Sequence, residues 1–281
     1  MKTMSKRKSK AFVLKVLLGV GLFVFFVINI FPLLWSLIVS LKYTIDAIRM
    51  PPELIFTPTF EYYVEVFSQE IFQMSFFNTM LISISSVFIS ILIGAPFGYA
   101  LSRYTNSGGF VLLMISLVFR ALPGMVFIIP YYYISINLGL YDTKILLILI
   151  TVATNQPFTI WMLRSFFITI PKSLDEASMV DGCNRFQAFF KTILPIMGPG
   201  VATTAIFTFL SAYNEFMLAQ ALTSTSAMTL PVMVSQLTTE NIRYWSTCAA
   251  SSVAIALPAI VITLVMQKYL IKGMTNGAVK G

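Results

Sequence analysis

The sequence predicts an all-α protein that crosses a membrane several times, and three observations support this class. Hydrophobic residues make up 57% of the 281 residues, whereas charged residues make up only 11%. A soluble domain of this length needs far more charge to cover its surface. The apolar residues form several stretches long enough to span a bilayer as helices. The net charge of +8 comes from Lys and Arg that lie mainly between or beside these stretches, which indicates a fixed orientation in a membrane.

The first apolar stretch follows a basic N-terminal segment, a pattern that a signal peptide shares. Its apolar run is about 30 residues long, which exceeds the apolar core of a signal peptide. No cleavage site of small residues follows it. We therefore expect an uncleaved first span.

Length and hydropathy predict six spans in all. The first two are joined by the longest outer loop, in which Phe60–Met74 carries aromatic residues among glutamates. This pattern fits an amphipathic helix on the outer membrane surface and, equally, a cap packed over the bundle. Gly94 and Gly98 have the spacing that permits close contact with another helix. The predicted spans are Leu17–Leu41, Phe77–Leu101, Gly109–Tyr133, Leu140–Phe167, Gly198–Leu222 and Cys248–Leu270.

An N-terminus in the cytoplasm satisfies the positive-inside rule. The outer segments and outer span ends then carry only Lys42, Arg49, Lys144 and Arg243, while Arg120 lies within the membrane. An even number of spans returns the chain to its starting side, so both termini are expected in the cytoplasm. The basic residues of the inner side are Lys2, Lys6, Arg7, Lys8, Lys10, Lys15, Arg103, Arg164, Lys172, Arg185, Lys191, Lys268, Lys272 and Lys280.

The inner loop between the fourth and fifth spans, about residues 168–195, carries signals for two short helices. Ser173 to Glu176 form a capping box, so we expect Ser173 to cap a first helix. Gly182 then stands where a residue in the left-handed conformation ends a helix. Asn184 to Gln187 resemble a second capping box. The loop is therefore expected to turn sharply about Gly182.

The second of these helices is expected to end before Pro195 and to present Phe186, Phe189 and Phe190. An aromatic surface outside the membrane requires a partner. The alternative is an amphipathic elbow that folds back onto the membrane interface. The residues alone leave both possibilities open.

The segment that begins at Glu176 resembles the EAA motif of ABC importer permeases. That motif is a Glu-Ala-Ala triplet, three residues, Gly, nine residues and an Ile-x-Leu-Pro ending. Two residues depart from it, because Ser178 replaces the third residue of the triplet and Thr192 stands where Ile is usual. The residues that match in register are Glu176, Ala177, Gly182, Leu194 and Pro195.

The resemblance extends over nearly the whole chain. The approach to the loop, Trp161–Phe167 with Ile170-Pro171, looks like that of the same family, and so does Tyr213–Phe216 in the fifth span. The tail Leu270–Gly281 is similar to the end of the smaller subunit of the maltose-type permease pair. The chain is thus similar to the smaller permease subunit of a carbohydrate importer.

This resemblance implies the fold of a type I ABC importer permease. It implies a single permease domain over residues 1–281, with residues 168–195 as the coupling loop and 271–281 as a cytoplasmic tail. Glu176 and Gly182 then dock in a groove of a separate ATPase, together with Ala177, Ser178, Leu194 and Pro195. The tail either reaches toward the ATPase dimer interface or is a frayed terminus. The tail residues expected at that contact are Thr275, Asn276 and Gly277.

The same resemblance implies the partners and the location. The partners are a second permease subunit, a dimer of cytoplasmic ATPase subunits, an extracytoplasmic solute-binding protein, a sugar and membrane lipid. ATP and Mg are expected on the ATPase, and no cofactor on this chain. The expected location is the cytoplasmic membrane of a bacterium or archaeon. The transported solute is expected to be an oligosaccharide or related sugar, and a non-sugar solute is the alternative.

Intramembrane polar groups are the candidates for the transport pathway. Arg120 and Glu215 carry charges within the membrane, and pairing would lower the free-energy cost of burying each charge. Such a pair has two equal interpretations, a structural contact between helices and a gate of the pathway. Sugar sites combine aromatic faces with polar groups, which draws attention to Tyr131, Asn155 and Gln156. The alternatives are an interfacial aromatic belt for the tyrosines and interhelical hydrogen bonds for the amides. The pathway candidates are Arg120, Tyr131, Asn155, Gln156, Tyr213 and Glu215.

Several other classes of protein are disfavoured by the composition. The chain has no His, which removes the commonest general base and metal ligand. Cys183 and Cys248 lie at opposite membrane faces in the predicted topology, so neither a disulfide nor a zinc site is expected. A proton-coupled carrier usually needs several membrane carboxylates, and the spans offer Glu215 alone. The Walker A pattern is absent from the sequence, so ATP energy has to come from a partner, and nucleic acid is not expected as a ligand.

Overall fold

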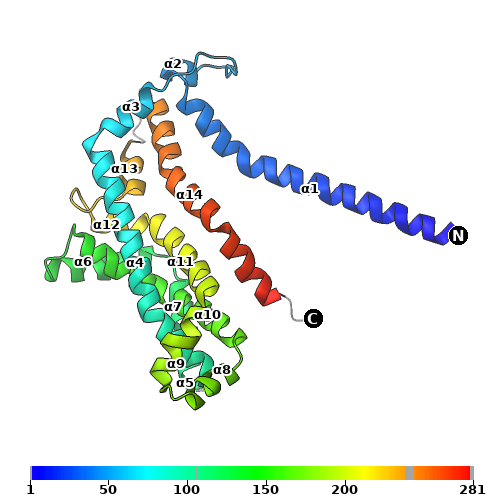
Figure 1. The fold of residues 1–281 in the computed structure, drawn as a ribbon. Helices are drawn as coiled ribbons and strands as arrows, with labels where there is room; N and C mark the ends of the chain where they lie inside the picture. The colour runs from blue at the N-terminus through cyan, green and yellow to red at the C-terminus, as the bar shows by residue number, and fades with distance from the viewer. Residues whose placement is uncertain (1, 105–106, 238–243, 279–281) are drawn as a thin grey trace. The chain divides into compact units, whose positions relative to one another are not determined.

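A computed structural model describes the backbone of residues 2–104, 107–237 and 244–278, and the side chains of residues 15–104, 108–237 and 244–268. Every regular element in these ranges is a helix, which confirms the predicted all-α class (Figure 1). The chain divides into two units. One is Met1–Ser68 with Leu237–Ala254, and the other is Gln69–Gln236 with Ile255–Gly281.

The first unit contains α1 (Lys2–Ser40), α2 (Thr44–Ala47), α3 (Glu61–Ser68) and the beginning of α14 (Trp245–Ala278). The connection after α1 is held by polar contacts. The Ser40 hydroxyl lies 2.7 Å from that of Tyr63, and the Thr59 N–H donates to the Leu41 carbonyl at 2.9 Å. The Lys42 side chain is buried and lies over the rings of Trp35 and Phe56. This loop is therefore a folded structure with its own hydrogen bonds.

The predicted single helix over Phe60–Met74 is wrong. Helix α3 ends at Ser68, and α4 (Glu70–Arg103) begins two residues later. Gln69 between them has extended backbone angles, φ −70° and ψ 124°. An extended residue cannot continue a helix, so the aromatic residues of the segment belong to two different helices.

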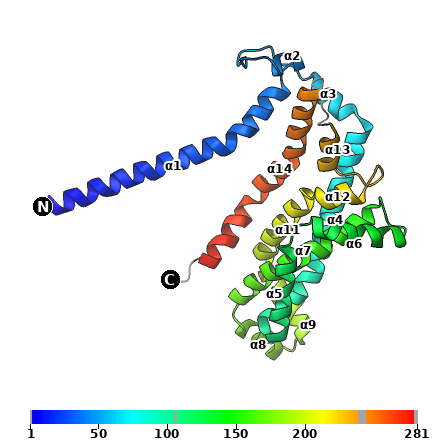
Figure 2. The ribbon, with the colours of Figure 1, turned by 180° about the vertical axis from the view of Figure 1, so that it is seen from behind.

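The second unit holds most of the long helices (Figure 2). They are α4, α5 (Ser107–Arg120), α6 (Met125–Asn137), α7 (Lys144–Thr169) and α11 (Gly198–Tyr213), together with the later part of α14. Two short helices, α12 (Met217–Leu222) and α13 (Leu230–Leu237), follow α11. Within the described residues, four helices are long and apolar enough to cross a membrane, and six spans result if each of two bent helix pairs counts as one. The predicted number of spans agrees with the second count, although the second bent pair joins Arg185–Ile196 of the predicted inner loop to Gly198–Tyr213 at an angle of 77°.

The third predicted span is broken, because α5 and α6 meet at an angle of 97°. Pro123 lies in the break and has no N–H to extend α5. The fifth predicted span ends early, at Tyr213 instead of Leu222. A new helix, α12, begins four residues later, and the Glu215 carboxylate accepts a hydrogen bond from the N–H of Leu218 in its first turn.

Helices α4 and α7 pack closely, as the spacing of Gly94 and Gly98 predicts. A Cβ atom on Gly98 would lie 3.1 Å from the backbone nitrogen of Arg164 and 3.2 Å from the carbonyl oxygen of Ile160. A Cβ atom on Gly94 would lie 3.0 Å from Thr159 Cγ2. Glycine at both positions therefore lets the two helices come together.

At the other end of α7, Asp142 organises the connection between α12 and α13. Its carboxylate accepts hydrogen bonds at 2.9–3.1 Å from the four backbone N–H groups of residues 224–227. Asp142 itself has φ +56°, which few residues other than Gly, Asn and Asp adopt readily. Burial alone raises the pKa of Asp142, but the four N–H donors outweigh it and lower the pKa to about 2.

We expect Asp142→Ala to destabilise the protein by about 2 kcal/mol, since it removes every charge-assisted bond to the loop. Asp142→Asn is expected to cost less, because asparagine tolerates the backbone angle and retains one acceptor oxygen. The folded pKa lies below the ordinary value of 3.8. The stabilisation is thus complete above about pH 4 and is lost as the pH falls toward 2. Thermal unfolding in detergent from pH 7 to pH 2 would measure this, and equal unfolding of the wild type and Asp142→Ala at pH 7 would contradict it.

Candidate functional site

The segment between α7 and α11 forms a helical elbow, residues 171–197. It contains α8 (Ser173–Val180), α9 (Arg185–Ala188), a π-helical turn η1 (Phe189–Ile193) and α10 (Leu194–Ile196). Helices α8 and α9 lie at the same end of the second unit as α5 (Figures 1 and 2). The elbow is the first candidate site.

The sharp turn of the elbow is confirmed at Gly182. This glycine has φ +89°, a conformation that favours glycine. Its N–H donates to the carbonyl of Met179, and the N–H of Cys183 donates to that of Ser178. These two bonds define a Schellman motif, which satisfies the last carbonyls of α8. The sequence signal and the geometry therefore agree.

Of the two predicted helix starts, one is confirmed and the other is wrong. Asn184 and Gln187 form the predicted capping box, since each side chain bonds the backbone of the other residue. The predicted cap at Ser173 is wrong. Lys172 already has helical angles, φ −63° and ψ −25°, so Ser173 lies inside the first turn and its hydroxyl makes no cap bond.

Two further expectations about the second helix are corrected. Phe186 is 72% exposed and Phe190 44% exposed, but Phe189 is only 4% exposed. Phe189 packs in the core between Tyr99 and Phe167. The helix also continues beyond Pro195 as α10, because a proline in the first turn of a helix needs no N–H.

The remaining motif residues lie on both faces of the elbow. Glu176, Ala177 and Pro195 are exposed, Leu194 is partly buried, and Ser178 is buried. Together with Val180, 87% exposed, the exposed residues give the elbow a free surface that combines a carboxylate with apolar side chains.

The two departures from the motif contact each other. The Ser178 hydroxyl donates to the Leu174 carbonyl at 2.8 Å and lies 2.9 Å from Thr192 Oγ1, at hydrogen-bond distance. The pair joins α8 to η1. A polar pair thus occupies the place where the motif has an alanine and an isoleucine.

This contact predicts coupled effects of substitution. We expect Ser178→Ala and Thr192→Val each to destabilise the elbow by about 1 kcal/mol, because each removes one partner of a half-buried hydrogen bond. The double variant Ser178→Ala/Thr192→Val is expected to cost less than the sum by about 0.5–1 kcal/mol. Ser173→Ala is the matched control, since Ser173 is exposed and caps nothing. Strictly additive values in a thermal double-mutant cycle would contradict the coupling.

A buried ionic cluster, which the sequence did not reveal, holds the inner face of α8. Arg103 Nε lies 2.9 Å from Asp175 Oδ2, and the two side chains are 9% and 12% exposed. Tyr99 donates its hydroxyl proton to the other oxygen of Asp175. Arg103 and Asp175 are far apart in sequence, and Arg103 is already explained by the positive-inside rule. Only the folded chain brings them together.

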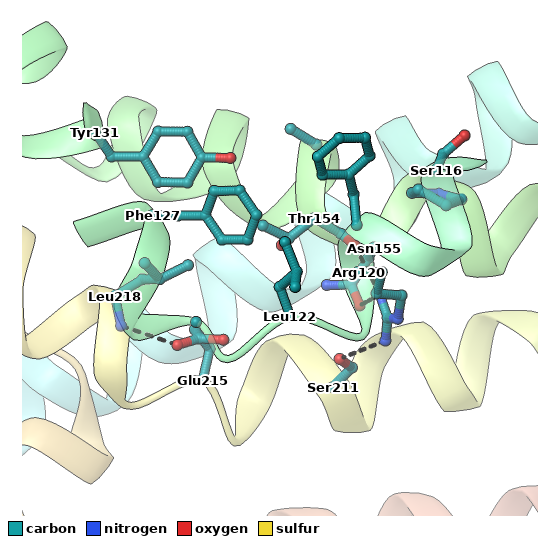
Figure 3. Close-up of a pocket in the computed structure, with 14 residues that line it drawn as sticks. Ser116, Arg120, Leu122, Phe127, Tyr131, Thr154, Asn155, Ser211, Glu215 and Leu218 are labelled. Atoms are coloured by element: carbon teal, nitrogen blue, oxygen red, sulfur yellow. Dashed lines mark hydrogen bonds between the residues drawn. The ribbon is translucent and has the colours of Figure 1, made fainter. Parts of the chain in front are cut away.

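The second candidate site is a cavity of about 450 Å³ at the break between α5 and α6 (Figure 3). The Arg120 guanidinium donates to the Thr154 carbonyl at 2.7 Å and to Asn155 Oδ1 at 2.9 Å, and lies 3.5 Å from the Ser211 hydroxyl. Thr154 lies next to the turn where Pro157 removes a donor from α7. The residues that line the cavity are Ser116, Phe119, Arg120, Leu122, Gly124, Phe127, Tyr131, Ala153, Thr154, Asn155, Pro157, Ser211, Glu215 and Leu218.

Arg120 and Glu215 line the same cavity but form no ion pair, so the direct pairing expected from the sequence is not present. Glu215 instead caps α12 through its bond to the Leu218 N–H, 3.0 Å long (Figure 3). Tyr131 and Asn155 also line the cavity, and Tyr131 stacks on Phe127.

Two pathway candidates lie outside this cavity lining. The Gln156 amide donates to the Ser90 carbonyl at 3.3 Å, which links α7 to α4. Tyr213 is 2% exposed, and its hydroxyl donates to the Ile255 carbonyl at 2.8 Å. Both contacts are of the interhelical kind.

The tail candidates Thr275, Asn276 and Gly277 lie on α14, which continues to Ala278 instead of ending near Leu270. Their side chains and residues 279–281 are outside the described part of the chain. Their predicted contact stays a prediction.

Comparisons with known proteins agree with one another. Residues 90–276 match the family model described as the binding-protein-dependent transport system inner membrane component. A probable ABC transporter permease protein of Sinorhizobium fredii is 36% identical over 90% of this chain and 91% of that protein. A trehalose transport system permease protein of Mycobacterium tuberculosis is 33% identical over 89% and 92%, and a trehalose/maltose one of Thermococcus litoralis is 30% identical over 95% and 97%.

A solved structure has the same fold. It is the crystal structure of a bacterial ABC transporter involved in the import of the acidic polysaccharide alginate, with a TM-score of 0.77. The match covers 92% of this chain and 96% of that one at 23% sequence identity.

Proposed function

Because the chain belongs to the family of binding-protein-dependent transport system inner membrane components, which are ABC transporter permeases, we propose that it is the permease subunit of an ATP-driven carbohydrate importer. The observation that carries the proposal is the elbow, whose Schellman turn at Gly182 leaves Glu176 and Ala177 exposed. The carbohydrate class is supported by the relatives named for trehalose and maltose transport. An oligosaccharide or a related sugar is the proposed substrate.

The elbow is the proposed contact with a dimer of ATPase subunits that bind ATP and Mg. Glu176 and Gly182 lie at its centre. Lys172 and Arg185 lie on the elbow and Arg103 lies beside it, and basic residues gather on the cytoplasmic side of membrane proteins. The elbow and both termini are therefore assigned to the cytoplasm. A second permease subunit and an extracytoplasmic solute-binding protein complete the proposed complex.

The proposed transport cycle is alternating access. ATP binding closes the ATPase dimer, the elbow moves with it, and the spans change from an inward-facing to an outward-facing state. The cavity at the α5–α6 break lies on the proposed pathway. Its combination of Phe127 and Tyr131 with Arg120 and Asn155 has the aromatic and polar character of sugar sites.

Co-purification tests the ATPase contact. The tagged wild-type chain, expressed with its neighbouring genes, is expected to retain an ATPase in detergent. Glu176→Lys reverses the charge at the centre of the exposed face and is expected to reduce the retained ATPase at least tenfold. Glu61→Lys is the matched control, since Glu61 is exposed on α3, outside the elbow. Retention of the ATPase by Glu176→Lys, or no ATPase on the wild type, would refute the proposal.

The substrate class has its own test. The purified complex in proteoliposomes is expected to hydrolyse ATP faster with a solute-binding protein loaded with a disaccharide than with the same protein unloaded. Stimulation by amino acids or inorganic anions in place of sugars would exclude the carbohydrate class and leave the permease assignment intact.

A further inference from the structure

We propose that Arg103 and Asp175 form the joint that passes movement of the elbow to helices α4 and α7. This inference rests on the proposed function, because it concerns how the ATPase moves the spans. Its starting observation is the buried ion pair, with 2.9 Å between Arg103 Nε and Asp175 Oδ2. Arg103 is the last residue of α4, and Asp175 lies in the first turn of α8.

Arg103 connects a third element to the same point. Its Nη1 donates to the carbonyls of Phe167 at 3.0 Å and Ile170 at 3.1 Å. These carbonyls lie at the C-terminal end of α7, where the helix dipole favours a cation. The Phe167 carbonyl also accepts the N–H of Ile170 at 3.2 Å. One guanidinium group thus joins the ends of α4 and α7 to the start of α8.

Separation of Arg103 from Asp175 is energetically unfavourable. Both side chains are largely removed from solvent, so separating them would leave a charge without its partner in a poorly solvated place. Tyr99, one turn before Arg103 on α4, donates its hydroxyl proton to Asp175. The Tyr99 ring also contacts the rings of Phe167 and Phe189, with centroids 5.6 Å and 4.9 Å apart. The ion pair therefore lies against an aromatic core that includes both α7 and η1.

The position of the joint on α8 matches the proposed ATPase contact. Asp175 is buried and Glu176, the next residue, is exposed. Successive residues of a helix point about 100° apart, so one turn of α8 carries both the outward docking group and the inward ionic group. A force applied at Glu176 acts on the same turn that Arg103 holds. Asp175 and Arg103 are accordingly positioning residues that make no contact with the ATPase.

The test distinguishes loss of ATPase binding from loss of the movement that the ATPase causes in the spans. A reporter cysteine, Ser116→Cys, is placed in the cavity lining of a chain that also carries Cys183→Ser and Cys248→Ser. Its rate of maleimide labelling is measured in the assembled complex. In the parent, ATP with vanadate is expected to change the labelling rate at least fivefold. With Asp175→Asn added, the ATPase is expected to be retained within twofold while the change in labelling falls below twofold. Tyr99→Phe is expected to give an intermediate change.

Asp181→Asn is the matched control, because Asp181 is an exposed aspartate at the end of the same helix. It is expected to keep the full response to ATP. If the Asp175→Asn complex retains its ATPase and shows the full change in labelling rate, the proposed joint is wrong. Loss of the ATPase from both Asp175→Asn and Tyr99→Phe also overturns it, since the cluster would then only build the docking surface. A parent that binds no ATPase, or whose reporter ignores ATP, contradicts the proposed function instead.

Discussion

Replacing Gly98 by leucine is expected to prevent α4 and α7 from packing and to destabilise the protein by about 3 kcal/mol or more. A Cβ atom on Gly98 would already lie 3.1 Å from the backbone nitrogen of Arg164 and 3.2 Å from the carbonyl oxygen of Ile160. Backbone atoms of a packed helix cannot rotate away, so the whole helix has to shift. Gly98→Ala is expected to cost about 1–3 kcal/mol for the same reason. The midpoint of thermal unfolding in detergent and the monodisperse fraction on gel filtration measure both effects.

Two other glycines provide controls for this prediction. The nearest contact of a Cβ atom on Gly94 would be with side-chain atoms of Thr159, Gln156 and Leu163. These atoms can move, so Gly94→Ala is expected to cost less than Gly98→Ala. A Cβ atom on Gly19 would meet nothing within 4 Å, and Gly19→Ala is expected to be neutral or stabilising by up to about 1 kcal/mol. Equal effects at Gly19 and Gly98 would show that helix propensity alone decides.

Reversing the charge at Arg120 is expected to abolish transport, and a second reversal at Glu215 is expected not to restore it. Arg120→Glu places a carboxylate against the carbonyl oxygen of Thr154, which now accepts a hydrogen bond at 2.7 Å. The loss is expected to be on the order of 3 kcal/mol, since a charged donor becomes a repelling acceptor. Uptake by cells that depend on the transporter is expected to fall below a tenth of the wild-type rate.

The double variant fails for a separate reason. Glu215 caps α12 by accepting the N–H of Leu218, and arginine has no acceptor with which to do so. Arg120→Lys is the conservative control and is expected to retain part of the activity, because it keeps the charge and can still donate to Thr154. Recovery of uptake in Arg120→Glu/Glu215→Arg would show that the two residues pair during transport.

The features of the elbow that sequence reasoning predicted correctly are local ones. Gly182 and the capping box at Asn184 depend only on residues within one turn, so their patterns determine their geometry. The predicted exposure of Phe189 is wrong because the helix is not regular at this residue. The π-helical turn begins at Phe189 and changes which side chains face the core. No propensity in the sequence signals such a turn.

The features that sequence reasoning missed depend on contacts between distant segments. Arg103 meets Asp175, and Asp142 meets the loop after α12, only once the helices have packed. The break between α5 and α6 was also missed, although Pro123 marks it. Hydropathy averages over a whole span and is blind to a bend within it. Composition therefore predicted the membrane class correctly, while the shape of the cavity required the folded chain.

The contact of Asp142 has a consequence for biogenesis. The four N–H groups that bind its carboxylate belong to residues 224–227, so the ribosome adds them some 80 residues later (about 4–16 s at ordinary synthesis rates). During that interval α6 is complete and α7 is synthesised, while the carboxylate between them lacks the four N–H donors. A nascent chain that stops before Ser224 thus has a loose hairpin at this end. The helix bundle therefore closes at this end only after the segment that follows α12 has been synthesised.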